Sequence, residues 1–166
     1  LRLFGYEGTV KAHMQVIRDM LEPRLGKVLE FTEWRQGDPA EQSARGIPTV
    51  LPLQIVNWHG GRGGHVGFSP VMPPDGALAL AQAQRMKARF EEAGLDYYTS
   101  FTMGRRHISN VNLLIYNRDD ADMVERSKAL FRTLIADSAS AGYAEYRTHT
   151  EFMGDIAQTF DFNGHA

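Results

Sequence analysis

The sequence contains no cysteine, and it has neither a strong net charge nor a long apolar run. Without cysteine, a disulfide framework and a thiolate metal site are both excluded, and a reducing compartment such as the cytoplasm is the one we expect. No apolar segment approaches the length of a membrane span. The formal charge of −2 gives no basic field. We therefore expect no nucleic acid and no membrane as partner.

The sequence also lacks a starting methionine and a leader segment, so we expect a piece from the interior of a longer protein. Its 166 residues, 43% of them hydrophobic, are enough to bury one core. No linker or strong internal repeat divides them. We therefore expect residues 1–166 to form a single domain.

Helical periodicity predicts four helices. The first covers Glu7 to Glu22 and is stopped by Pro23; its apolar stripe consists of Val10, Met14, Ile17 and Leu21. The second runs from about Asp75 to Ala93, with Gly94 as its stop, and carries Ala79, Ala83, Met86, Phe90 and Ala93. The third begins at a cap on Asp119 or Asp120 and ends at Gly142, with Met123, Ser127, Leu130 and Leu134 on one stripe. A short last helix carries Phe152, Ile156 and Phe160.

Branched and aromatic residues predict five strands. Their ranges are Lys27 to Trp34, Leu51 to Trp58, Tyr97 to Met103, Ile108 to Tyr116 and Tyr143 to Thr148, with an exposed loop from Gln36 to Thr49. The third and fourth strands are expected to pair as a hairpin, and Val111, Leu113 and Ile115 form an apolar face on the fourth. This order of elements predicts an α+β fold, an antiparallel sheet with helices on one face.

Glycine is concentrated between His59 and Pro70, where five glycines accompany two histidines in the run HGGRGGHVGFSP. So many glycines indicate backbone that passes close to another group. A flexible hairpin loop that enters a strand explains the composition equally well. His65 could correspondingly be a hydrogen-bonded histidine with no reactive role.

Three functional motifs fail in this segment. A dinucleotide fingerprint needs a third glycine that opens a helix, but Val66 and a strand-like segment follow Gly63. Ser69 lacks the second glycine of a hydrolase elbow. A metal site at His59 and His65 lacks a third ligand, so we predict no metal.

A second group of polar residues runs from Glu145 to His149, in the order EYRTH. Charged residues at a strand edge usually form a solvated face, and Thr148 or Thr150 could simply cap the next helix. A tyrosine hydroxyl and a fixed cation can also hold a phenolate or a carboxylate. In a regular strand, however, Tyr146 and Arg147 point to opposite faces, so both reach one ligand only if the strand ends or twists there.

Four stretches together resemble the cap domain of the vanillyl-alcohol oxidase and 4-cresol dehydrogenase family, most closely its bacterial eugenol oxidase-like members. They are GHVGFSP from Gly64, EAGLDY from Glu92, RTLI from Arg132 and EYRTH from Glu145. The resemblance covers nearly the whole chain. The interval from His65 to Tyr146 (146 − 65 = 81 positions) matches the family's interval between its flavin-linked histidine and its Tyr-Arg pair.

This resemblance implies residue roles. His65 would carry the covalent bond to the flavin of FAD, and Tyr146 with Arg147 would bind the phenolate oxygen of the substrate and serve catalysis. The 4-cresol dehydrogenase branch uses an earlier tyrosine for the flavin, and the corresponding position here is Asn57. Gly67 would lie on the wall of the substrate pocket, where it leaves room for a substituted ring.

The implied activity is oxidation of para-substituted phenols by hydride transfer from the benzylic carbon to flavin N5 through a quinone methide. Phenolate is the reactive form, and a phenol with a pKa of about 10 needs a nearby cation to ionise at neutral pH. Oxygen is the expected electron acceptor. The expected partners are a small phenolic substrate, oxygen, the enzyme's own FAD-binding domain outside this chain, and further copies in a homo-oligomer.

Two other functions remain open at this point. One is a 4-alkylphenol dehydrogenase that passes electrons to a cytochrome. The other is a non-enzymatic α+β ligand-binding module, since ordinary packing accounts for every predicted element. Because the FAD-binding domain would lie elsewhere, we expect the 166 residues alone to be inactive.

Overall fold

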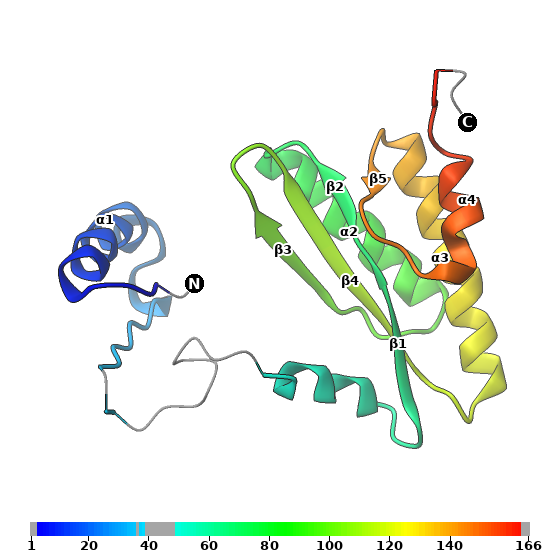
Figure 1. The fold of residues 1–166 in the computed structure, drawn as a ribbon, viewed down its shortest axis with the longest axis horizontal. Coiled ribbons are helices and arrows are strands. Elements are labelled where there is room, and N and C mark those ends of the chain that lie inside the picture. Colours follow the sequence, from blue (N-terminus) through cyan, green and yellow to red (C-terminus); the bar gives the residue numbers. More distant parts are fainter. Residues whose placement is uncertain (1–2, 36, 39–48, 164–166) are drawn as a thin grey trace. The chain divides into compact units, whose positions relative to one another are not determined.

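A computed structural model describes residues 3–35, 37–38 and 49–163 of the chain (Figure 1). The chain divides into two compact units, Leu1–Pro52 and Leu53–Ala166. Most of the predicted loop from Gln36 to Thr49 lies outside the described residues. That all 166 residues form one cap domain stays a prediction.

The first unit is built on helix α1, Glu7–Leu25, followed by the short 3-10 helix η1, Gly26–Val28. The predicted start of the helix is confirmed, but Pro23 does not stop it. Proline removes only one N–H in the last turn, and the helix ends where Gly26 takes a positive φ of 51°. The predicted strand from Lys27 to Trp34 is wrong. Strand-forming residues need a hydrogen-bonding partner, and none pairs with this segment within the described residues.

The second unit contains a five-stranded antiparallel sheet (Figure 1). Its strands are β1 (Gly63–Phe68), β2 (Pro70–Met72), β3 (Thr99–Met103), β4 (Ile108–Asn117) and β5 (Ala144–Glu145). Strands β1 and β2 pair one after the other with β4, separated only by Ser69. Strand β3 also pairs with β4, as the predicted hairpin requires, and β5 pairs with β2.

Strand prediction failed at the start of this unit. Leu51–Asn57 forms a 3-10 helix, η2, in place of the predicted strand from Leu51 to Trp58. The segment that does form a strand is β1, whose glycines hide it from a prediction based on β propensity. Its burial nevertheless alternates along Val66, Gly67 and Phe68, because it packs one side on the core.

Helices α2 (Gly76–Glu92) and α3 (Ala121–Ser140) form as predicted. The Asp75 side chain accepts hydrogen bonds from two backbone N–H groups at the start of α2, and Asp120 accepts one from Met123 N–H at the start of α3. Both helices contribute to one hydrophobic core with the sheet. Its buried members are Val66, Phe68, Met86, Phe90, Leu95, Leu114, Leu130, Phe131, Leu134, Ile135 and Phe152. Because alternate residues of the sheet join this core, the helices cover one face, and the predicted α+β class is confirmed.

The apolar residues Val111, Leu113 and Ile115 are on the face of β4 away from this core. The residues that face the helices are Ile108, Asn110, Asn112 and Leu114, and both asparagines are fully buried. Asn112 Nδ2 donates to the Phe68 carbonyl oxygen at 3.2 Å and to Asn110 Oδ1 at 3.0 Å. Hydrogen bonds thus make a polar core position tolerable. The sheet is therefore apolar on both faces of β4.

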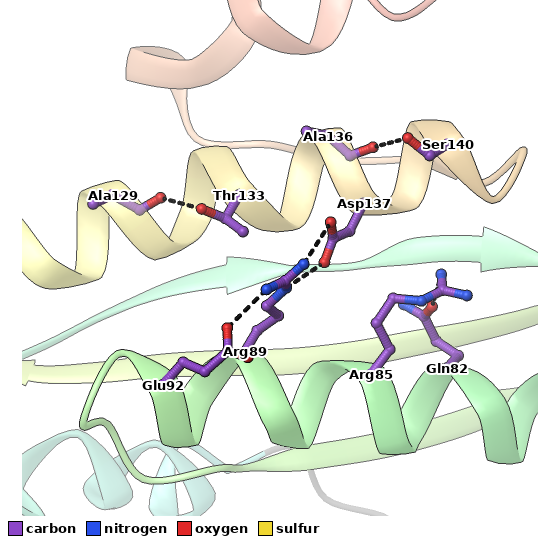
Figure 2. A network of polar contacts seen from close by, with 9 residues as sticks. All are labelled: Gln82, Arg85, Arg89, Glu92, Ala129, Thr133, Ala136, Asp137 and Ser140. Atoms are coloured by element: carbon purple, nitrogen blue, oxygen red, sulfur yellow. Dashed lines mark hydrogen bonds and ion pairs between the residues drawn. The ribbon is translucent and has the colours of Figure 1, made fainter.

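Helices α2 and α3 are also joined at the surface of the unit (Figure 2). Arg89 on α2 donates to both carboxylate oxygens of Asp137 on α3, at 2.7 and 3.3 Å, and to Glu92 at 2.7 Å. This two-pronged contact fixes the position of one helix against the other. It lies apart in sequence from the two polar motifs.

The end of the unit is more irregular than predicted. Strand β5 has two residues rather than the predicted six, because the chain bends at Tyr146 and Arg147. The last predicted helix is divided into η3, Thr150–Phe152, and α4, Met153–Ala157. Phe152 is buried against Phe131, with ring centroids 4.1 Å apart, whereas Phe160 lies beyond α4. Within the described residues, no helix is both long and apolar enough for a membrane span.

Candidate functional site

His65 lies in the middle of β1, opposite Ile115 of β4. Its neighbours Val66 and Phe68 belong to the hydrophobic core, while His65 itself is exposed. Because successive strand residues alternate, Val66 points toward the helices and the imidazole toward the opposite face. Across the described part of the chain, no hydrogen bond or ion pair engages this imidazole. It is thus free to react with or to bind a group from outside this chain.

Two glycines before His65 are required by packing within the chain. A side chain at Gly63 would collide with the Val56 carbonyl oxygen, and a Cβ at Gly64 would lie 2.9 Å from the ring of Tyr116. The backbone does pass close to another group here, as the composition suggested, but that group is the chain itself. These glycines therefore give no independent sign of a ligand.

Gly67 differs from them. A Cβ at this position would meet only Leu113 Cδ2, at an ordinary contact distance of 3.9 Å. Gly67 has the same strand parity as His65, so both lie on the face away from the helices. Glycine thus leaves open space beside the exposed imidazole, next to the apolar residues Leu113 and Ile115.

The bend after β5 resolves the geometric difficulty of Tyr146 and Arg147. Since β5 ends at Glu145, the two side chains are not held on opposite faces of a strand. Both are exposed, and the Arg147 Cζ lies 5.8 Å from the centroid of the Tyr146 ring, within the range of a cation–π contact. Arg147 forms no ion pair with any described residue. Its charge is available to an anion.

The two motifs meet at Ser69, the residue between β1 and β2. Tyr146 N–H donates to the Ser69 carbonyl oxygen at 3.4 Å. His65 stands four residues earlier, about 13 Å away along an extended strand. The structure therefore brings the histidine segment and the Tyr-Arg pair to neighbouring strands, with Gly67 between them.

Glu145 is the site residue that sequence reasoning missed. A charged residue at a strand edge was expected to be solvated, but Glu145 is only 7% exposed, whereas Tyr146 is 55% exposed. Its Oε1 accepts a hydrogen bond from Ser69 N–H at 3.1 Å. Burial raises the pKa of Glu145 to about 7, and the hydrogen bonds from Ser69 and Thr148 act in the opposite direction. Only the pairing of β5 with β2, invisible in the sequence, places this carboxyl inside.

The other histidine of the segment has a different environment. His59 Nε2 is buried and lies 3.6 Å from Asp96 Oδ2, which also accepts a hydrogen bond from Trp58 Nε1 at 2.8 Å. Asp96 thus holds both Trp58 and His59. No three His, Asp or Glu side chains of the described residues are placed to share a metal ion.

Comparison with known proteins bears out the predicted resemblance. No family model matches the chain. Over 163 residues it is 30% identical to the 4-cresol dehydrogenase [hydroxylating] flavoprotein subunit of Pseudomonas putida, a match that covers 95% of this chain and 31% of that protein. The chain therefore spans about a third of the length of this relative.

Two solved structures share the fold. One is 4-ethylphenol oxidase from Gulosibacter chungangensis in complex with isoeugenol, with a TM-score of 0.80 and 25% identity. The other is p-cresol methylhydroxylase with substrate bound, with a TM-score of 0.78 and 26% identity. Each match covers 96% of this chain and 32% of the solved chain. The chain is thus similar to one portion of enzymes that act on para-substituted phenols.

Proposed function

We propose that this chain is the cap portion of a FAD-dependent enzyme that oxidises para-substituted phenols. The observation that carries the proposal is the joint exposure of Tyr146 and Arg147 at the end of β5, beside the strand that carries His65. The names of the relatives, a flavoprotein subunit and two phenol-oxidising enzymes, support the same activity.

His65 fits a covalent attachment point for the flavin. Its imidazole is exposed and has no partner in the described part of the chain, so neither nitrogen is occupied. The neighbouring face of the sheet offers the space at Gly67 and the apolar side chains of Leu113 and Ile115, which suit a flat aromatic ring. When bound there, the flavin would supply the hydride acceptor for oxidation of the benzylic carbon to a quinone methide. The FAD-binding domain itself would lie outside this chain.

Tyr146 and Arg147 would bind the phenolate oxygen of the substrate. A phenol has a pKa of about 10, so a favourable site must stabilise its anion at neutral pH. Arg147 carries a permanent charge with no carboxylate partner in the described residues, and the Tyr146 hydroxyl adds a donor. The negative charge on the ring oxygen offsets the positive charge that develops at the benzylic carbon. Both residues therefore act on the ionisation of the substrate.

Oxygen is the electron acceptor that we propose. Asn57, at the end of η2, stands where the dehydrogenase branch has its flavin-linked tyrosine, and an amide side chain offers no phenol for that bond. The relative from Pseudomonas putida is named a dehydrogenase, so transfer to a cytochrome is the second candidate. Oxygen consumption by the full-length protein without an added acceptor distinguishes the two.

The test of the proposal uses the full-length protein and a panel of 4-alkylphenols and 4-hydroxybenzyl alcohols, with detection of hydrogen peroxide. Intact mass after denaturation would show the added mass of FAD. Absence of covalent flavin together with absence of phenol turnover would favour a ligand-binding module instead. Cytoplasmic location and a homo-oligomeric state remain predictions that these measurements do not address.

A further inference from the structure

Strand β5 carries the Tyr-Arg pair but is held in the sheet by few backbone hydrogen bonds. It has two residues, and its partner at Glu145 is Pro70, which has no N–H to donate. The adjacent bond, from Tyr146 N–H to the Ser69 carbonyl oxygen, is long at 3.4 Å. Backbone pairing alone therefore fixes the start of the bend weakly.

The Glu145 side chain supplies a second connection at the same point. Its Oε1 accepts from Ser69 N–H at 3.1 Å, so the N–H and the carbonyl of Ser69 both bind the segment from Glu145 to Tyr146. Ser69 is the residue immediately after β1, the strand of His65. The carboxyl therefore ties the Tyr-Arg bend to the His65 strand.

Burial makes this connection specific. Glu145 Oε2 and Thr148 Oγ1 are both inaccessible to solvent, so the residues on either side of the Tyr-Arg pair face inward while the pair faces outward. Burial raises the pKa of Glu145 to about 7, which leaves a neutral carboxyl well populated near neutral pH. A neutral carboxyl keeps its carbonyl oxygen as acceptor for Ser69 N–H.

We propose that Glu145 is a positioning residue that holds Tyr146 and Arg147 in register with the His65 strand through Ser69. The inference rests on the proposed function of the Tyr-Arg pair, and Glu145 itself would not touch the phenol. Loss of this hydrogen bond would let the bend shift relative to β1. A displacement of about 1 Å is enough to lower the efficiency of a positioned group by up to about a hundredfold.

Three substitutions in the full-length holoenzyme separate this role from simple packing. Glu145→Met preserves length and removes the acceptor, and Glu145→Asp preserves the carboxyl but is one methylene too short for Ser69 N–H. Glu145→Gln preserves both the length and the acceptor oxygen. Glu151→Gln is the matched control, because Glu151 is exposed and pairs with Lys128 at 3.1 Å.

The measurement is the binding of 4-chlorophenol, with its phenolate absorbance followed against pH, together with covalent flavin content. We expect Glu145→Met and Glu145→Asp to weaken binding by about tenfold or more and to move phenolate formation to higher pH. Glu145→Gln and the control should match wild type, and all four variants should keep their flavin. Either Met or Asp is sufficient if the other does not fold.

Wild-type binding in folded Glu145→Met or Glu145→Asp protein would overturn the inference. Equal loss in Glu145→Gln would also overturn it, because the acceptor is retained there. A failure of the proposed function looks different, since Arg147→Met would then leave phenolate formation unchanged. If Arg147→Met shifts it and the Glu145 variants do not, only the positioning role is rejected.

Discussion

Arg147 and Tyr146 are consecutive residues whose side chains lie together, with the guanidinium carbon 5.8 Å from the centre of the phenol ring. Neighbours in a regular strand would point to opposite faces. The end of β5 at Glu145 releases them from that alternation. A cation and a hydroxyl donor thereby share one exposed position at the edge of the sheet.

This geometry predicts how substitutions in the pair affect a bound phenol. Arg147→Met removes a fixed cation, and each unit by which the pKa of the bound phenol rises corresponds to about 1.4 kcal/mol. Tyr146→Phe removes one hydrogen bond to a charged oxygen, about 1.5 to 3 kcal/mol. Absorbance of a bound 4-substituted phenol against pH measures both effects. An unchanged titration in Arg147→Met would mean that the pair is a solvated strand edge.

A second prediction concerns the flavin bond. His65→Ala in the full-length protein should abolish covalent flavin and leave the fold intact, because the exposed imidazole contributes nothing to the core. His59→Ala is the matched control, since His59 lies against Asp96 and should not carry the flavin. In-gel fluorescence after denaturing electrophoresis gives the readout. A fluorescent His65→Ala band would reject this assignment.

Gly67 is predicted to set the room available to the substrate. Gly67→Phe should fold, because a Cβ there meets only Leu113 at 3.9 Å, but the ring would fill space beside His65. We expect kcat/KM to fall more for 4-propylphenol than for 4-methylphenol. Gly64→Ala is the contrasting variant, since its Cβ would lie 2.9 Å from the Tyr116 ring and cost about 1 to 3 kcal/mol of stability. Equal losses for both phenols in Gly67→Phe would contradict a role in specificity.

The buried carboxyl of Glu145 predicts a pH dependence of stability. Its pKa is raised from 4.5 to about 7, so between these values the folded protein binds more protons than the unfolded chain. Stability should therefore fall as pH rises through this window, by on the order of 3 kcal/mol, with the loss complete above pH 7. Glu145→Gln does not ionise and should melt progressively higher than wild type from pH 5 to pH 8. A constant difference across this range would show that Glu145 ionises normally.

Local sequence determined the elements whose signals act within one segment. Helices α2 and α3 formed where periodicity and the caps at Asp75 and Asp120 indicated, because capping and amphipathic spacing are properties of neighbouring residues. The hairpin of β3 and β4 was predictable for the same reason, since its strands are adjacent along the chain. The candidate residues His65, Gly67, Tyr146 and Arg147 could also be named from motif and spacing.

Tertiary structure alone decided how those residues meet. The pairing of β5 with β2 joins positions 76 residues apart, and it buries Glu145 while it leaves Tyr146 and Arg147 exposed. The sequence predicted apolar residues on β4 but not which face receives the helices, because hydrogen bonds let Asn110 and Asn112 occupy the core. Strand β1 was hidden by glycines that its close contacts with Val56 and Tyr116 require. In each case the deciding contact is long-range, and no local propensity records it.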